Sequence, residues 1–234
     1  MKKIIGIVPK GVPYEKNHNQ LQHYHLGNSY VARIREAGGI PICLAPVDGR
    51  LSPEQLSLCD GFIAQGGTQM WPYHFQVIHH AVTTGKKYLG VCLGMQLIHR
   101  YYAMRQMVEA QGTEGALDEQ IIDLFFNKGI GEDLLHRVEG HHPVASFQDS
   151  RKAKHDVAIL PGSVLHNLLG KEQICGASYH NWCVKDPVDA LTVNAWAADG
   201  TIEGIENGSN ILGVQFHPEV DDLLPEIFRF LTEL

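Results

Sequence analysis

Cys92 is the residue whose surroundings most favour chemistry. It follows the apolar run Leu89–Val91 and precedes a helical pattern that begins at Leu93, with Gly90 and Gly94 leaving room around it. A side chain on such a sharp strand-to-helix turn projects above the sheet, and the positive end of the helix favours the reactive thiolate. The stretch therefore predicts a nucleophile, although a buried structural cysteine at a strand end fits the same residues.

Two glycines follow another expected strand, at residues 61–64. Gly66 and Gly67 stand at its carboxyl end, which is the edge where ligands bind in open α/β sheets. Glycine lets a backbone N–H approach a ligand closely. We expect the amides of Gly67 and Leu93 to form an oxyanion hole, in which one donor is typically worth about 3 kcal/mol. A plain tight turn is the alternative, and the glycine pair alone favours it.

A histidine and a carboxylate follow the last apolar strand pattern. His217 comes directly after residues 211–216, Pro218 ends the strand, and Glu219 follows. A thiol nucleophile needs a base that takes its proton and returns it to the leaving amine, and the base needs an acceptor that holds its ring. The sequence thus predicts a catalytic triad of Cys92, His217 and Glu219, with a surface histidine at a strand end as the alternative.

The elements that position these residues alternate between strands and helices in the first hundred residues. We expect strands at 4–8, 40–44, 61–64 and 88–91, and helices at 28–37 (capped by Asn28 or Ser29), from 53, at 75–84 and at 93–102. This alternation implies parallel strands with helices on both faces. Strands at 157–160, 191–197, 201–205 and 211–216, a hairpin turn at Asp199–Gly200 and a helix at 225–234 complete the pattern. The second half looks more antiparallel, so we expect a mixed sheet.

Composition places further limits on the protein. The chain has 234 residues, 44% of them hydrophobic, which suits one sizeable domain. Its formal net charge of -7 argues against nucleic acid or an anionic membrane as the main partner. No apolar stretch approaches the roughly 20 residues of a membrane span, and no signal peptide is evident. Five cysteines without paired spacing suit a reducing compartment, so we expect a soluble cytoplasmic protein.

The two motifs together make the sequence recognisable. Residues 90–96 (GVCLGMQ) with residues 214–219 (VQFHPE) resemble the class I glutamine amidotransferase signature. Residues 37–41, 154–165 and 197–206 are similar to one branch, the γ-glutamyl-γ-aminobutyrate hydrolase-like (γ-glutamyl hydrolase) family. The resemblance covers 1–102 and 154–234. It leaves 104–153 as a weakly patterned insertion or lid, in which 121–126 form either a helical turn or a strand.

The resemblance carries expectations about fold and chemistry. It implies a single three-layer α/β domain over 1–234, with an open, mixed but mostly parallel sheet of flavodoxin-like type. It also implies a thioester intermediate and a small-molecule γ-glutamyl amide substrate, without metal or organic cofactor. By the same analogy, the glutamyl half contacts Gly66, Gln96, Ser178, Tyr179 and His180. A free-standing hydrolase, a glutaminase subunit that supplies ammonia to a separate synthase and a non-catalytic binding protein all remain open, as does a homodimer.

The sequence departs from the family pattern around the expected substrate site. Ala177, Asn181 and Trp182 replace an asparagine, a histidine and a glutamine of the usual Asn-Ser-x-His-His-Gln run. Leu93 replaces an arginine, and the loop after Gly67 lacks the usual acidic residue and Asp-x-x-Arg-Asp run. The triad is untouched, so we expect the departures to alter the amine half of the substrate.

Fourteen histidines raise the question of a metal site. The clusters His23/His25, His79/His80 and His141/His142 lack the spacing of known metal motifs, so we expect solvated surface histidines. His155 belongs to the family-like stretch 154–165, where a structural hydrogen bond and a binding role are both open.

Overall fold

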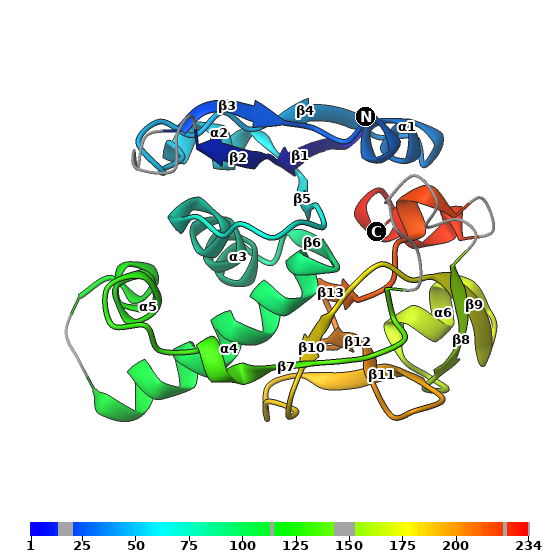
Figure 1. Ribbon diagram of the computed structural model, residues 1–234. Coiled ribbons are helices and arrows are strands. Elements are labelled where there is room, and N and C mark those ends of the chain that lie inside the picture. The colour runs from blue at the N-terminus through cyan, green and yellow to red at the C-terminus, as the bar shows by residue number, and fades with distance from the viewer. Residues whose placement is uncertain (14–20, 113–114, 143–152, 222–223, 234) are drawn as a thin grey trace.

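A nine-stranded mixed sheet runs through the middle of the molecule (Figure 1). The computed structural model describes residues 1–13, 21–112, 115–142, 153–221 and 224–233. The strand order is β4 (Ile40–Cys43), β1 (Ile4–Val8), β5 (Gly61–Ala64), β6 (Lys87–Val91), β13 (Ile211–Val214), β12 (Ile202–Glu206), β11 (Thr192–Ala197), β8 (Lys154–Ile159) and β9 (Gln173–Ala177). The strands from β4 to β13 pair in parallel, and those from β13 to β9 pair antiparallel. The expected mixed sheet is confirmed.

Helices cover both faces of this sheet because successive strand residues point to opposite sides. Phe62 and Tyr88 pack into one apolar cluster, while their neighbours Ile63 and Leu89 pack into the other. The first cluster includes side chains of α2 (Pro53–Leu58), α3 (Pro72–Thr84), α4 (Leu93–Gln111) and α5 (Leu117–Phe126). The second includes side chains of α1 (Asn28–Glu36), α6 (Val164–Leu169) and the 3₁₀ helix η4 (Pro225–Leu231). This is the three-layer α/β arrangement that the sequence predicts.

Several boundaries differ from the expectation. Helix α1 has Gly27 as its N-cap, so neither Asn28 nor Ser29 caps it. Helix α3 begins at Pro72, where the backbone N–H of Trp71 donates to Nδ1 of His74. Helix α4 continues well beyond residue 102, and the expected C-terminal helix is a 3₁₀ helix. These ends depend on side-chain contacts and packing that periodicity does not report.

Two small antiparallel sheets were not expected. Strand β2 (Lys10–Pro13) pairs with β3 (Leu21–His25), and β7 (Leu135–Arg137) pairs with β10 (Trp182–Val184). These strands are only three to five residues long, too short to show clearly the apolar alternation that marks a strand in sequence. The first pair follows β1 directly in the chain. In the second pair, a strand that precedes residue 143 lies beside a strand that follows β9.

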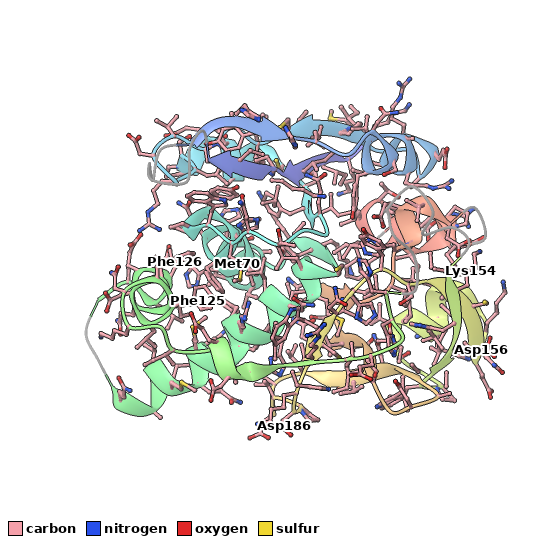
Figure 2. The ribbon with its side chains drawn as sticks, in the orientation of Figure 1. Met70, Phe125, Phe126, Lys154, Asp156 and Asp186 are labelled. Carbon is pink, nitrogen blue, oxygen red and sulfur yellow. The ribbon has the colours of Figure 1, made fainter. Side chains whose placement is uncertain are left out.

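The described part of segment 104–153 adds a helix to the body of the protein. Helix α5 buries Ile121, Ile122, Leu124 and Phe125 in the cluster that α3 and α4 share, so the helical alternative for 121–126 is correct. The Phe75 and Phe125 rings lie 5.2 Å apart, and Figure 2 shows Phe125 and Phe126 directed from α5 toward this interface. A 3₁₀ turn, η1 (Glu132–Leu134), leads into β7. Residues 143–152, the other part of the expected lid, lie outside the described residues.

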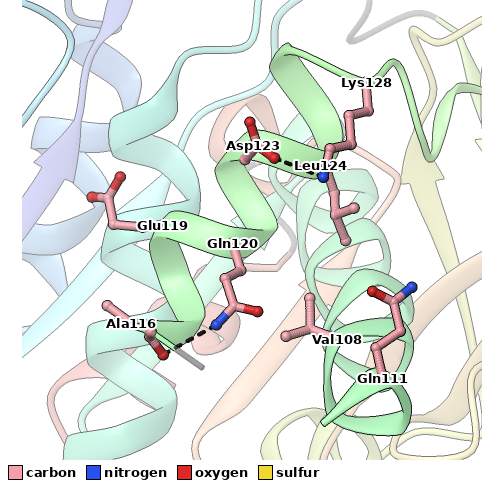
Figure 3. A pocket seen from close by; sticks show the side chains of 9 residues that line it. Val108, Gln111, Ala116, Glu119, Gln120, Asp123, Leu124 and Lys128 are labelled. Carbon is pink, nitrogen blue, oxygen red and sulfur yellow. Dashed lines mark hydrogen bonds and ion pairs between the residues drawn. The ribbon is translucent and has the colours of Figure 1, made fainter. Parts of the chain in front are cut away.

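A pocket lies between α4 and α5 (Figure 3), lined by Val108, Gln111, Ala116, Glu119, Gln120, Asp123, Leu124 and Lys128. None of these is a predicted site residue, so this pocket is separate from the predicted triad. Within the described ranges, no helix has the length and apolar character needed to cross a bilayer.

Candidate active site

Cys92 occupies the turn between β6 and α4, with backbone angles φ 51° and ψ −104°. Only one other non-glycine residue in the described ranges, Asp48, has a positive φ. Such a conformation costs about 1–3 kcal/mol and persists only where surrounding structure enforces it. Two close backbone contacts around the turn enforce this conformation of Cys92. A Cβ atom on Gly90 would lie 2.5 Å from the backbone of Gly94, and one on Gly94 would lie 2.7 Å from the carbonyl oxygen of Ala64.

His217 stands beside Cys92 because β13 pairs in parallel with β6. Val214 is opposite Val91 in the register, and the Cys92 N–H donates to the Val214 carbonyl at 2.8 Å. The 3₁₀ turn η3 (Pro218–Val220) then places Glu219 so that its Oε1 lies 2.8 Å from His217 Nδ1. All three side chains are buried. The predicted triad residues are therefore brought together in space.

The electrostatics of this cluster favour a charged imidazole. Burial works against the charge, but the charges of Glu219 and Cys92 and hydrogen bonds to both raise the pKa of His217 to about 10. The charged imidazole thus lies between an orienting carboxylate and the cysteine sulfur, which is the arrangement of a proton carrier next to a nucleophile.

Tyr30 was missed in the sequence, although it touches the triad directly. From helix α1, its hydroxyl donates to Glu219 Oε1 at 2.8 Å and accepts the Gly66 N–H at 3.0 Å. Burial, followed by the charge of Glu219, raises the pKa of Tyr30 well above its ordinary value, so the hydroxyl stays a donor. Tyr30 thus links the orienting carboxylate to the glycine loop. Its 189-residue separation from Glu219 left no local signal that could have found it.

The glycine loop lies against the reacting groups. A Cβ on Gly66 would approach His217 Cε1 to 2.8 Å and Cys92 Cβ to 3.2 Å, so only glycine fits this position. The Gly66 N–H is occupied by Tyr30, and within the described ranges no hydrogen bond is seen from the amides of Gly67 or Leu93. These two free amides are the pair that the sequence predicted for an oxyanion hole.

The side chain of Gln65 fixes this loop to the end of the sheet. Its Oε1 accepts the Gly27 N–H at 2.7 Å, and its Nε2 donates to the Val8 carbonyl at 2.9 Å. Because Gln65 is almost fully buried, its amide groups would be unsatisfied without these partners. The loop is therefore held in place before any substrate binds.

Lys10 is a second residue that the sequence did not single out. It begins β2, and its Cδ and Cε lie 3.7 Å from the position of a Cβ on Gly67. Burial lowers the pKa of Lys10, while the charges of Glu219 and Cys92 act in the opposite direction. A cation consequently stands beside the predicted oxyanion loop and within the field of the triad.

The residues predicted to hold the glutamyl half are mostly engaged with the protein. Gln96 Nε2 donates to the Trp182 carbonyl at 2.9 Å and to Gln215 Oε1 at 3.1 Å, which uses both of its hydrogens. Ser178 Oγ donates to the His141 carbonyl at 2.7 Å. Only Tyr179, which is partly exposed and lies against the His142 ring at 4.0 Å, is accessible in the described structure.

The expectation of solvated histidines holds for some positions and is wrong for others. His23 and His25 are exposed on β3. His141 is instead buried at 5% exposure and contacts the fully buried Glu203, as do His155 and His180. His79 is partly buried, with Nδ1 3.0 Å from the Tyr101 hydroxyl. The correction follows from burial of a carboxylate, which attracts polar side chains that sequence spacing cannot pair.

Comparison with known proteins agrees with this geometry. A model of the peptidase C26 family matches residues 3–85 and 73–219. The chain belongs to the peptidase C26 family. Among its relatives, Protein NtpR of Enterococcus hirae is 26% identical over 216 residues, spanning 82% of this chain and 80% of that protein. Imidazole glycerol phosphate synthase subunit HisH of Bacillus subtilis is 26% identical over 209 residues, spanning 84% and 86%.

The solved structures confirm the fold of this peptidase C26 protein. The glutaminase domain of CTPS from Trypanosoma brucei, with bound acivicin, superposes with a TM-score of 0.66 at 18% identity, covering 98% of this chain and 92% of that domain. The resemblance to the class I glutamine amidotransferase-like superfamily is thereby confirmed, and the family supports a hydrolase or amidotransferase enzyme.

Proposed function

We propose that the protein is a cysteine-dependent hydrolase of γ-glutamyl amide bonds. The observation that carries the proposal is the meeting of Cys92, on its strained turn, with the His217–Glu219 pair. Gly67 and Leu93 add two unused backbone amides beside the sulfur. A nucleophile, a proton carrier, an orienting acceptor and oxyanion donors are the groups that acyl transfer to a thiol requires.

The mechanism follows from these positions. The Cys92 thiolate attacks the γ-carbonyl carbon, and the electrons of the C=O bond move to the oxygen, which the Gly67 and Leu93 amides stabilise. When this intermediate collapses, His217 donates its proton to the departing amine and a thioester remains. A water molecule then loses a proton to His217 and attacks the thioester, which releases glutamate and restores the thiolate–imidazolium pair.

Lys10 supplies a charge that suits the glutamyl half. A γ-glutamyl group carries an α-carboxylate only three carbons along its chain from the reacting carbonyl. The Lys10 side chain lies along Gly67, next to the predicted oxyanion hole. We assign Lys10 to binding of this carboxylate, a role for which a flexible ammonium group is well suited.

A glutaminase subunit is the second candidate function. The Bacillus subtilis relative HisH is a subunit of imidazole glycerol phosphate synthase, and the alignment spans most of both chains. In that case the same residues would hydrolyse glutamine and the ammonia would pass to a separate synthase. The two functions share the triad and differ only in the leaving amine and in dependence on a partner.

Turnover by the chain alone separates the two. We expect hydrolysis of γ-glutamyl amides across a panel that varies only in the amine, with apolar or bulky amines preferred over γ-aminobutyrate because Leu93 and Trp182 replace polar residues. The Cys92→Ala variant is the control, because it measures any hydrolysis that does not depend on the proposed nucleophile. Activity restricted to glutamine, or appearing only with a synthase added, would favour the subunit role. Equal turnover of α-linked glutamyl amides would refute the γ-glutamyl assignment.

A further inference from the structure

Three histidines surround one oxygen of a buried glutamate. Glu203, on β12, has no exposed surface. Its Oε1 lies 3.2 Å from His141 Nδ1, 3.3 Å from His155 Nε2 and 3.3 Å from His180 Nε2. The four side chains come from different segments: β12, β8, and the stretches that precede residue 143 and follow β9. Such convergence on a carboxylate inside the protein needs a physical reason, because an uncompensated buried charge is strongly unfavourable.

The hydrogen bonds that the three histidines offer Glu203 are long. The three distances exceed the 2.7–2.9 Å of a typical charge-assisted N–H···O bond. Within the described ranges, neither oxygen of Glu203 has a hydrogen-bond partner of good geometry, and the three ring nitrogens that face it also have none. Four ligands at about 2.0–2.1 Å around a tetrahedral metal ion lie ~3.3 Å from one another, which matches the three separations between Glu203 Oε1 and the ring nitrogens.

The outer ring nitrogens of two histidines fix the tautomer that a metal ligand needs. His141 Nε2 lies 3.0 Å from Asp199 Oδ2, and His180 Nδ1 lies 3.3 Å from the Trp182 carbonyl oxygen. Both oxygens only accept, so these nitrogens carry the protons. A metal ion that binds here displaces any proton on the inner nitrogens, whose lone pairs then serve as ligands beside Glu203. A carboxylate or carbonyl behind a histidine is the usual support of a metal-bound imidazole.

We propose that His141, His155 and Glu203 bind a divalent transition-metal ion, and that His180 Nε2, 3.3 Å from the same Glu203 oxygen, is the candidate for a fourth ligand. The three ligand atoms all lie within 4.8 Å of one another. Imidazole and carboxylate ligands in tetrahedral geometry suit Zn²⁺ best. The proposal is independent of the hydrolase assignment, since none of these side chains belongs to the triad.

The ion would brace the loop beside the active site. The His141 carbonyl accepts hydrogen bonds from Ser178 Oγ and from the His180 N–H, at 2.7 and 3.0 Å. The neighbouring Ala177 carbonyl accepts the His217 N–H at 2.8 Å. Metal binding at His141 would therefore fix the backbone against which His217 rests.

Metal titration of the whole chain tests this proposal. After treatment with a chelator, the wild type is titrated with Zn²⁺ and with Co²⁺, whose visible absorption reports tetrahedral coordination. We expect one equivalent to bind and the Tm to rise, and we expect Glu203→Gln and His155→Ala to lose both effects. A double variant, His23→Ala with His25→Ala, is the control, because those exposed rings lie 5.0 Å apart and offer an incidental chelate.

Each outcome of the titration either supports the metal site or overturns it. Retention of the bound equivalent by the double variant and its loss from both site variants would support the site. Binding that disappears only with the β3 pair, that survives Glu203→Gln and His155→Ala, or that is absent from the wild type would overturn it. Circular dichroism checks that each variant folds. Should Glu203→Gln fail to fold, the partly exposed His155 provides the deciding variant.

Discussion

Cys92 combines a reactive position with a backbone that only surrounding contacts can enforce. We predict that Cys92→Ala abolishes amide hydrolysis and leaves the fold intact, because the sulfur forms the covalent intermediate. Cys92→Gly should be more stable than Cys92→Ala by about 1–2 kcal/mol, since glycine adopts φ 51° without strain. Activity assays and urea denaturation check both statements. Residual turnover in Cys92→Ala, or loss of activity on replacing the exposed Cys43 or Cys175 instead, would contradict the assignment.

Tyr30 provides a prediction that only the structure could suggest. Tyr30→Phe removes the donor to Glu219 and leaves the Gly66 N–H without its acceptor. We expect a loss of about 1–3 kcal/mol in unfolding free energy and a fall of roughly tenfold in kcat. The matched control is Tyr88→Phe, because the buried Tyr88 hydroxyl has no partner in the described structure. If both variants behave alike, the hydroxyl bridge has no role in the site.

Lys10 offers a test of substrate recognition at the same scale. Lys10→Met keeps the aliphatic chain against Gly67 and removes the charge. We expect KM for a γ-glutamyl amide to rise about tenfold with kcat changed far less, since the carboxylate is bound alike in ground and transition states. A substrate whose α-carboxyl is blocked as an amide should be insensitive to the change. Equal sensitivity of both substrates would remove Lys10 from the binding site.

At the scale of elements, the site depends on how closely α4 begins against the sheet. Gly94→Ala would force a Cβ to 2.7 Å from the Ala64 carbonyl, and neither strand β5 nor helix α4 can move without disturbing Cys92. We predict a loss of about 3 kcal/mol or more in stability together with loss of activity. Gly67→Ala meets only ordinary contacts of 3.6–3.7 Å and should retain near wild-type stability. Comparable unfolding midpoints for the two variants would contradict this account.

Elements of the buried sheet could be predicted from sequence, while those at its margins could not. Strand β5 was predicted at its observed bounds, and β6 and β13 within two residues, because buried strands read as apolar runs ended by glycine or proline. Strand β3 (Leu21–His25) is polar and escaped notice. The triad residues each follow such a run, which is why their proximity was predictable.

Contacts between distant polar residues lay beyond sequence reasoning. Tyr30 meets Glu219 only because α1 packs against the turn η3, and no spacing in the chain encodes that pairing. The prediction of a surface position for His141 was wrong, since no residue near it in the sequence indicates its contact with the buried Glu203. Long-range pairing of polar groups is decided by the fold, so it becomes visible only with the structure.

For the molecule as a whole, the parallel and antiparallel halves of the sheet contribute different parts of the site. The parallel half delivers Cys92 and the glycine loop, which lie at the carboxyl ends of β6 and β5. Strand β13 closes that half and carries His217 to the same edge. The antiparallel half holds the Glu203 cluster and the backbone that supports His217. The reacting groups and their support therefore come from the two halves of one continuous sheet, which meet where β13 pairs with β12.

The protonation of His217 links the site to the stability of the whole protein. Its pKa, about 10 when folded, lies above the ordinary value of about 6.5 expected for the unfolded chain. Below pH ~6.5 both states bind the proton, so the stabilisation is fully present. Between about 6.5 and 10 only the folded state holds the His217 proton, so this proton by itself makes the free energy of unfolding fall as pH rises, by at most about 1.4 kcal/mol per pH unit.

Urea denaturation of Cys92→Ala and of Cys92→Ala with His217→Asn between pH 7 and 9.5 measures this contribution, because neither variant has the thiol, whose proton uptake on unfolding would offset the His217 proton. We expect the unfolding free energy of Cys92→Ala to decline more steeply across that window, since Glu219 still holds the imidazole charged and asparagine carries no proton to lose. His217→Asn should also reduce turnover far more than Glu219→Gln, since His217 moves protons and Glu219 only orients it. Parallel pH slopes for the two proteins would show that the imidazole is not held charged in the folded state. The thiolate–imidazolium pair assumed in the mechanism would then have to be abandoned.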